Sequence, residues 1–144
     1  MNLAIALARF VVGALLMLAG ALKIGHAAQL ASAVAGFRLL PAPAVSFVGI
    51  VLPYFEILLG LYLVIGLFTR ISAIVAALAF ALYAGAIASA IVRGIPADCG
   101  CFGPNDVAVA DWPHVAFDLV LAVIAAFIAY GAPGRFAVDR RLVS

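Results

Sequence analysis

The sequence predicts an all-α membrane protein: a bundle of four transmembrane helices with a short interfacial helix between the first and second spans. Of the 144 residues, 69% are hydrophobic and only 10% are charged, and the mean hydropathy is +1.33. Soluble domains are about 45–50% apolar and about 25% charged. These values exclude a soluble globular domain and intrinsic disorder. The net charge is only +2 without a dense basic cluster, so nothing indicates nucleic-acid binding.

Four apolar stretches are long enough to cross the hydrocarbon core of a bilayer, which takes about 20 helical residues. Their approximate bounds are 3–22, 44–68, 71–92 and 113–131. Because only Thr69 and Arg70 separate the second stretch from the third, these two form an antiparallel hairpin. Small residues recur every four positions in the third stretch, at Ala81, Gly85 and Ser89, which indicates close helix packing. Nothing marks a second domain, so we expect one domain over residues 1–144.

The first stretch also has features of a secretory signal peptide. Arg9 precedes an apolar run that ends in Ala19-Gly20-Ala21, a pattern typical of a cleavage site. However, the residues before this run are themselves mostly apolar, and cleavage would leave three spans. We therefore expect the first span to be retained.

Two segments are neither spans nor short turns. Residues 24–43 mix apolar residues with His26, Gln29 and Arg38, which favours a short helix lying on the membrane surface. Residues 93–112 form the longest polar stretch, and their glycines and prolines favour a structured loop.

The basic residues near the ends of the spans predict the orientation in the membrane. With four spans, both termini and the second turn share one side, which carries more arginines than the other. We therefore expect cytoplasmic termini in the inner membrane and an exoplasmic loop between the third and fourth spans. The basic residues compared are Arg70, Arg135, Arg140 and Arg141 on the first side, with Arg9 able to reach it, and Lys23, Arg38 and Arg93 on the second.

The chain has two cysteines, and they stand together in that loop as Cys99-Gly100-Cys101. Gly100 gives the backbone the freedom that so small a disulfide ring requires. Strained, exposed disulfides are typically labile or catalytic, and this one would close almost no loop and so stabilise little. The pattern favours a redox-active pair over two reduced cysteines packed among apolar residues.

A metal site is a competing interpretation of the same residues. Two thiolates and His114 could bind Cu(I) or Zn(II), although the spacing of a four-ligand zinc site is absent. Without a metal, a protonated His114 near the thiols would favour the reactive thiolate.

Several charged residues fall inside the apolar stretches, where charges usually face a partner or a polar cavity. Glu56 and Arg9 come out about 18 and 21 Å deep at 1.5 Å per residue, so we predict that they pair. Such a pair serves either to hold the bundle together or to handle protons. Asp118 lies near the exoplasmic end of the fourth span, with His114 four residues before it and Lys23 at a matching depth to neutralise it.

Aromatic residues in the second stretch suggest a weak candidate for a quinone site. Phe47, Tyr54 and Phe55 could line it, with Pro53 bending the helix to open space beside Glu56. The alternative is that these aromatics anchor the helix at the membrane interface.

Three motifs, one in each of the first two spans and one in the cysteine loop, together resemble the MauE family, the methylamine-utilisation membrane proteins, within the broader DoxX-like superfamily. The first span ends in Gly20-Ala-Leu-Lys23, and the second contains Pro53-Tyr-Phe-Glu56-Ile-Leu-Leu-Gly60. The most specific motif is Asp98-Cys99-Gly100-Cys101-Phe102-Gly103-Pro104, and the resemblance covers nearly the whole chain. Family members often carry an Arg-Asp pair where this chain has Phe117-Asp118.

The resemblance implies periplasmic disulfide handling with a thioredoxin-like partner, during maturation of a cysteine-rich dehydrogenase subunit. We therefore expect a membrane thiol–disulfide oxidoreductase in which Cys99 and Cys101 are catalytic and Asp98, Gly100 and Phe102 support their loop. Electrons would pass to or from a membrane carrier such as a quinone. The alternative is a non-enzymatic membrane subunit, or a copper- or zinc-binding chaperone, that recruits a partner.

Overall fold

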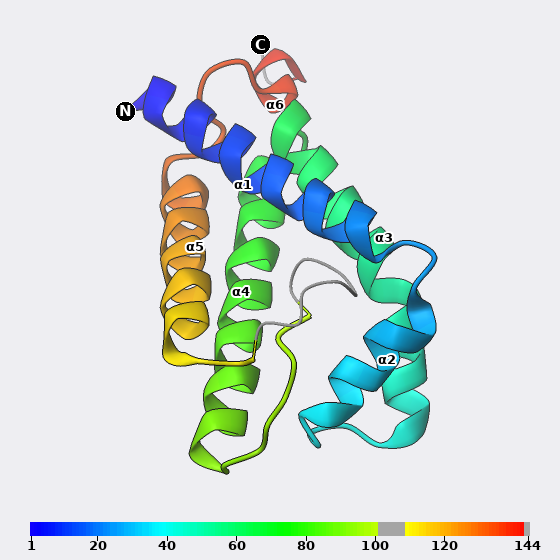
Figure 1. Ribbon diagram of the computed structural model, residues 1–144. Coiled ribbons are helices and arrows are strands. Elements are labelled where there is room, and N and C mark those ends of the chain that lie inside the picture. The colour runs from blue at the N-terminus through cyan, green and yellow to red at the C-terminus, as the bar shows by residue number, and fades with distance from the viewer. Residues whose placement is uncertain (101–108, 143–144) are drawn as a thin grey trace.

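The computed structural model describes residues 1–100 and 109–142 of the chain, and their regular structure is helical apart from one β-bridge (Figure 1). Four of the helices, α1, α3, α4 and α5, are long and apolar enough to cross a membrane, which confirms the predicted fold class. The short helix α2 lies between the first two spans, as predicted. The helix bounds are α1 Asn2–Lys23, α2 Ala27–Gly36, α3 Ala42–Ile65, α4 Thr69–Val92, α5 Trp112–Gly131 and α6 Val138–Leu142.

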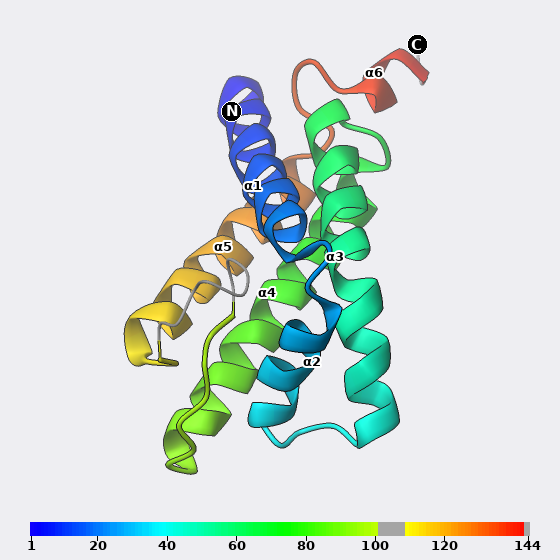
Figure 2. The same ribbon diagram turned by 45° about the vertical axis from the view of Figure 1, so that its right-hand side comes forward.

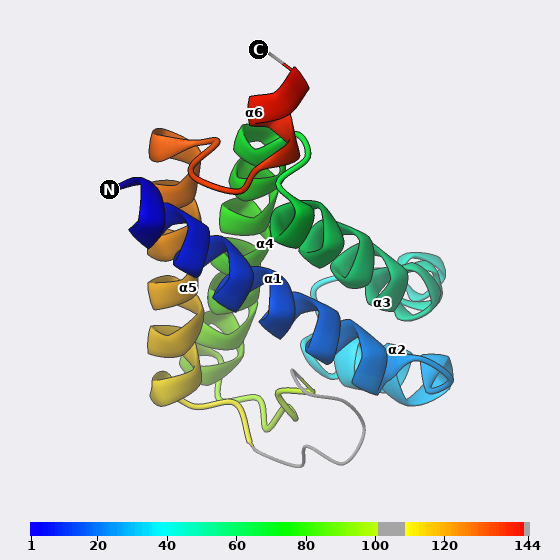
Figure 3. The same cartoon turned by 90° about the horizontal axis from the view of Figure 1, so that it is seen from above.

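The four long helices form two antiparallel pairs, α1 with α3 and α4 with α5 (Figure 3). The pairs come together at the end of the molecule that holds the N-terminus and α6, and they diverge toward the end that holds α2 (Figures 1 and 2). The main apolar core fills the region where the pairs meet. Its fully buried members include Ile5, Val12, Leu63, Ala76 and Ile128.

Glycines set the close approach of α1 to α3. A Cβ on Gly13 would lie 2.7 Å from the carbonyl oxygen of Gly60, and one on Gly60 would lie 2.5 Å from that of Gly13. Two backbones this close leave no room for a side chain at either position. Of the small residues predicted to mediate packing in α4, Ala81 and Gly85 are exposed, and a Cβ on Gly85 would meet open space, whereas Ser89 is half-buried.

The register of the α1–α3 pair leaves the beginning of α3 beyond the end of α1. Gly13 lies beside Gly60, and a Cβ on Gly20 would lie 2.5 Å from the carbonyl oxygen of Pro53. The first turns of α3 therefore extend past Lys23, where α1 ends. Helix α2 covers this extension, and a Cβ on Gly49 would lie 2.8 Å from the carbonyl oxygen of Ala27.

Arg9 of α1 joins three segments at the end where the helix pairs meet. Its guanidinium donates to the carbonyl oxygens of Leu63 (3.0 Å) and Val64 (3.4 Å), in the last turn of α3. It also donates to those of Pro133 (2.8 Å) and Arg135 (3.2 Å), which follow α5. The last carbonyls of a helix lack partners within the helix. Arg9 therefore caps α3 and fastens the C-terminal segment to it.

Asp139 of α6 caps the beginning of α4 at the same end of the molecule. Its carboxylate accepts the backbone N–H groups of Phe68 (2.8 Å) and Thr69 (2.7 Å), where α4 begins. Burial raises the pKa of Asp139, but the hydrogen bonds from Thr69 and Phe68 outweigh it, so the pKa lies below its ordinary value. The α3–α4 turn, the N-terminus and α6 thus share one end, while the cytoplasmic location of that end stays a prediction.

Candidate functional site

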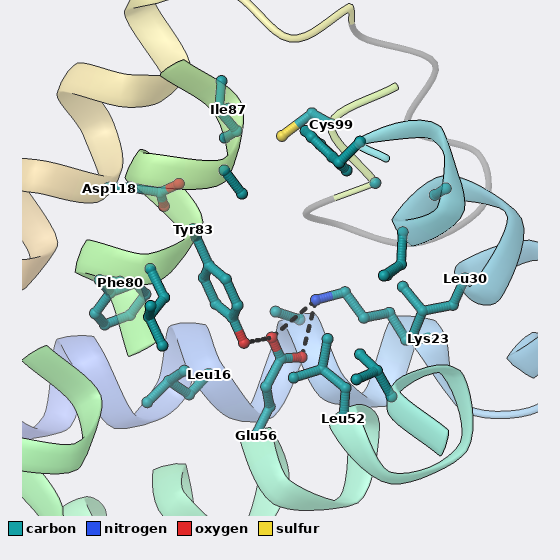
Figure 4. A pocket seen from close by; sticks show the side chains of 18 of the residues that line it. Leu16, Lys23, Leu30, Leu52, Glu56, Phe80, Tyr83, Ile87, Cys99 and Asp118 are labelled. Carbon is teal, nitrogen blue, oxygen red and sulfur yellow. Dashed lines mark hydrogen bonds and ion pairs between the residues drawn. The ribbon is translucent and has the colours of Figure 1, made fainter. Parts of the chain in front are cut away.

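A cavity of about 420 Å³ lies where the two helix pairs diverge (Figure 4). Its walls come from α1 to α5, through apolar side chains such as Leu16 of α1, Leu30 of α2, Leu52 of α3 and Phe80 and Ile87 of α4. Sites for small molecules typically have volumes of about 300–1,000 Å³ and mostly apolar walls with a few polar groups. This cavity has the size and the lining of such a site.

A buried ion pair lies in the cavity wall. The ammonium group of Lys23 donates to both carboxylate oxygens of Glu56, at 2.9 Å each, and both side chains are almost fully buried. The hydroxyl of Tyr83 donates to Glu56 Oε1 at 3.0 Å, so three helices contribute to this network. Charges at membrane depth are costly unless they are paired and hydrogen-bonded. The network satisfies this condition without any group from outside the chain.

The predicted pair between Arg9 and Glu56 is wrong. The prediction assumed that α3 begins level with the end of α1, but α3 begins beyond that end. Glu56 therefore lies between the levels of Gly13 and Gly20 of α1, nearer to Lys23 than to Arg9. In addition, helical side chains point back toward the N-terminus of their helix. Lys23, in the last turn of α1, therefore reaches back to Glu56, whereas Arg9 reaches toward the opposite end of the molecule.

Asp118 of α5 also lines the cavity, and its carboxyl group points toward it in Figure 4. The residue is 5% exposed, and its Oδ2 atom has no hydrogen-bond partner within the described part of the chain. The partners predicted for it are engaged elsewhere, because Lys23 binds Glu56 and the ring of His114 binds Asp111. A buried polar atom without a partner costs free energy, so this oxygen calls for an explanation.

His114 stabilises the beginning of α5. Asp111, just before the helix, accepts the backbone N–H of His114 at 3.2 Å and lies 2.5 Å from its ring Nδ1. The hydrogen bond from the His114 side chain is the main reason that the pKa of Asp111 lies below its ordinary value. Among the described residues, no three His, Cys, Asp or Glu side chains are grouped to hold a metal ion. The metal interpretation also needs Cys101, which lies outside the described residues.

Cys99 forms part of the cavity wall at the side of the loop between α4 and α5. It is 9% exposed, it packs against Ala84, Ile87 and Val115, and Figure 4 shows its sulfur directed toward the cavity. Gly100, which also lines the cavity, has φ +61°, a left-handed conformation that glycine adopts without strain. Cys101 and Phe102 lie outside the described residues, so the predicted Cys99–Cys101 pair stays a prediction.

The two arms of the cysteine loop are joined at their base. Asp98 and Val109 form an antiparallel β-bridge, and the N–H of Ala110 donates to the carbonyl of Ala97 at 2.9 Å. The side chain of Asp98 is exposed, so its described contribution is this backbone pairing. Pairing at the base fixes the position of Cys99 relative to the cavity.

Arg93 connects α2 to the end of α4 at the rim of the cavity. Its guanidinium donates to the carbonyl oxygen of Phe37, just after α2, and its Nε donates to Ser89 Oγ at 3.1 Å. The Phe37 side chain lines the cavity, so this contact helps to hold α2 as a wall.

The aromatic residues suggested for a quinone site lie elsewhere. Phe47, Tyr54 and Phe55 are exposed on the outer face of α3, and none of them lines the cavity. Sequence reasoning instead missed Tyr83, which binds Glu56. The available signal was a hydroxyl group in the middle of an apolar span, where a buried tyrosine needs a hydrogen-bond partner.

The fold and the site define a multi-pass membrane protein with a ligand-sized cavity beside a cysteine-bearing loop. The chain belongs to the MauE family, since the family model described as "Methylamine utilisation protein MauE" matches residues 1–131. It is 36% identical over 122 residues to the methylamine utilization protein MauE of Paracoccus denitrificans, covering 83% of this chain and 66% of that protein. The matched region thus spans less than two thirds of the relative's length. No solved structure matches the chain.

Proposed function

We propose that this protein is a membrane thiol–disulfide oxidoreductase that uses Cys99 and Cys101 on the exoplasmic side. It acts with a thioredoxin-like partner in the maturation of a disulfide-containing periplasmic protein. The observation that carries the proposal is the place of Cys99, on a loop joined at its base and directed toward a membrane cavity. A cysteine needed only for packing would require neither feature. The family description suggests a client protein used in methylamine utilisation.

The burial of Cys99 supports different roles for the two sulfurs. Cys99 is buried and packs among apolar side chains, which hinders attack by a partner protein, so we expect the partner to react at Cys101. A thiolate of the partner attacks Cys101 in the Cys99–Cys101 disulfide, a mixed disulfide forms, and Cys99 leaves as a thiolate. The partner's second thiolate then attacks its own sulfur in the mixed disulfide. The partner leaves oxidised, and the cysteine pair is left reduced.

Single-cysteine variants test this assignment. In Cys99→Ser the thiolate of Cys101 attacks the disulfide of the oxidised partner, and one partner sulfur leaves as a thiolate. No Cys99 thiolate remains to displace the reduced partner, so this variant should trap the partner as a covalent complex. Cys101→Ser is the matched control, and we expect little trapping because its remaining sulfur is buried. Complexes are detected on non-reducing gels, released by dithiothreitol and identified by mass spectrometry. Equal trapping by the two variants would contradict the assigned roles.

The double variant tests whether the cysteines serve redox chemistry or packing. A ring closed over one residue contributes little loop-closure stability, so Cys99→Ser/Cys101→Ser should fold normally. It should nevertheless fail to support disulfide formation in the client protein in cells. A folded double variant that supports full maturation of the client would refute the proposed function.

The orientation can be tested on intact cells. A membrane-impermeant thiol reagent should label the reduced cysteine loop and spare a cysteine introduced after Leu142. The reverse labelling pattern would place the cysteine loop in the cytoplasm, where thiols are kept reduced, and would contradict an exoplasmic function.

A further inference from the structure

We propose that the cavity binds the head group of a membrane-soluble quinone, which accepts the electrons of the Cys99–Cys101 pair. This inference rests on the proposed function, because it supplies the acceptor that reoxidises the reduced cysteines. It places the quinone between the two helix pairs, away from the exposed aromatics of α3.

The first support is the apolar character of the cavity and its depth in the bundle. Its walls are side chains of four membrane-spanning helices and of α2, and its volume of about 420 Å³ suits a small ring compound. A ligand for such a site has to partition into the bilayer. Water-soluble acceptors, such as nucleotides, would leave their charged groups without matching partners in these walls.

The second support is the set of polar side chains that line the cavity. Asp118 is 5% exposed, lines the cavity and has an Oδ2 atom without a partner in the described residues. Lys23 uses two bonds on Glu56, and an ammonium group has three protons to donate. A quinone carries two carbonyl oxygens on an apolar ring, and these become hydroxyls on reduction. A carboxyl group can donate to the carbonyl and accept from the hydroxyl, whereas a lipid acyl chain would satisfy neither group.

The third support is the position of the Cys99 sulfur. Cys99 lines the same cavity as Lys23, Glu56, Tyr83 and Asp118, and its sulfur is directed toward it in Figure 4. The reaction balances without a further reagent. Two S–H bonds break and one S–S bond forms, which releases two electrons and two protons. The quinone takes up both electrons and both protons and leaves as the hydroquinone, with Asp118 passing a proton to a ring oxygen.

Binding is tested with the full-length protein in lipid nanodiscs, using ubiquinone-1 as the probe. Ala86 lines the cavity on α4, whereas Ala81 on the same helix is exposed. Ala86→Trp should fill the cavity and weaken ubiquinone-1 binding at least tenfold, and Ala81→Trp should change it less than twofold. Thermal unfolding reports whether each variant is folded, and Val48→Trp on the opposite wall replaces Ala86→Trp if that variant is not. Unchanged binding in a folded, cavity-filled variant overturns the proposal.

A second probe separates a quinone site from a site for any apolar chain. A benzene that carries the same prenyl side chain lacks only the two carbonyl groups. We expect it to bind at least tenfold more weakly than ubiquinone-1. Equal affinity for the two probes would show a lipid-binding cavity and would overturn the proposal.

The role of Asp118 is tested by single-turnover reduction. Dithiothreitol-reduced, desalted protein should reduce one ubiquinone-1 per cysteine pair, followed by the loss of quinone absorbance. Asp118→Asn keeps the size and polarity but cannot pass a proton. We expect its reduction rate to fall at least tenfold while its affinity for ubiquinone-1 changes less than threefold. An unchanged rate would show that Asp118 does not transfer the proton.

The inference and the proposed function can fail separately. If the protein exchanges disulfides with its partner but shows no cavity-dependent ubiquinone-1 binding, the quinone site is wrong and the proposed function stands. If ubiquinone-1 binds in the cavity but the cysteines trap no partner, the proposed function is wrong and the binding site stands. The Cys99→Ser/Cys101→Ser variant should reduce no ubiquinone-1, because it lacks the two thiols that supply the electrons.

Discussion

Helix α1 carries a buried cation near each of its ends, and the two have different surroundings. Arg9 donates to backbone carbonyls of α3 and of the segment after α5. Lys23 binds the carboxylate of Glu56 in the wall of a cavity that is also lined by Asp118, whose Oδ2 atom has no hydrogen-bond partner among the described residues. Near the N-terminal end of α1, backbone carbonyls accept the hydrogen bonds of the guanidinium. Near its C-terminal end, the polar groups line a cavity.

This difference teaches that a buried charge in a membrane helix does not by itself mark a functional site. Intramembrane ionisable residues are by default functional candidates. Arg9 departs from this default because its planar guanidinium spans several fixed carbonyls and stabilises the end of α3. Lys23 and Glu56 remain functional candidates, because they line a cavity together with Asp118. Stability and ligand binding should therefore respond differently to changes at the two ends.

The largest effect is expected from Arg9→Met. Four carbonyls lose charge-assisted hydrogen bonds worth about 1.5–3 kcal/mol each, so we expect a loss of about 4–6 kcal/mol after partial rescue by water. Chemical unfolding in detergent measures it. Arg9→Lys should recover only part of this loss, because an ammonium group cannot span the four acceptors. Where Arg9→Met remains folded, it should bind ubiquinone-1 as the wild type does, and a loss of binding would break the contrast between the two ends.

A double-mutant cycle on Lys23 and Glu56 comes next. Removing one partner of a buried pair leaves an uncompensated charge and costs about 3–5 kcal/mol. Lys23→Met and Glu56→Gln should each destabilise the protein by this amount, and the combined variant should lose clearly less than their sum. Unlike Arg9→Met, Lys23→Met should also weaken ubiquinone-1 binding. Additive losses in unfolding free energy would contradict direct pairing.

The smallest effect is expected at Asp139, which contacts only the end of the molecule that holds the N-terminus and α6. Asp139→Ala removes the cap of α4, which should cost about 1 kcal/mol. The lowered pKa of Asp139 means that its stabilisation is complete above the ordinary carboxyl pKa and is lost as the pH falls through the folded value. The stability difference between wild type and Asp139→Ala should therefore shrink under acid conditions. A difference that stays constant down to acid pH would exclude the ionised cap.

Composition and apolar length predicted the four spans and the short helix α2, because the thickness of the bilayer dictates how long an apolar helix must be. The partners of the buried charges were not predicted, since they depend on the relative register of α1 and α3. That register follows from close contacts between Gly13 and Gly60, which no pattern in a single sequence identifies. The cavity was likewise missed, because it arises from the divergence of the two helix pairs. Cys99 was singled out from the sequence, but its place in the cavity wall was not.

The contacts of Arg9 also have a consequence for the order of events during biosynthesis. Arg9 lies in α1, yet Pro133 and Arg135, which supply two of its acceptors, are 124 and 126 residues further along the chain. A newly inserted α1 therefore carries a cation whose final hydrogen bonds cannot yet form. Other groups have to satisfy this charge until the segment after α5 has been synthesised. The end of the bundle that Arg9 holds together can thus be completed only after α5 and the segment that follows it have been made.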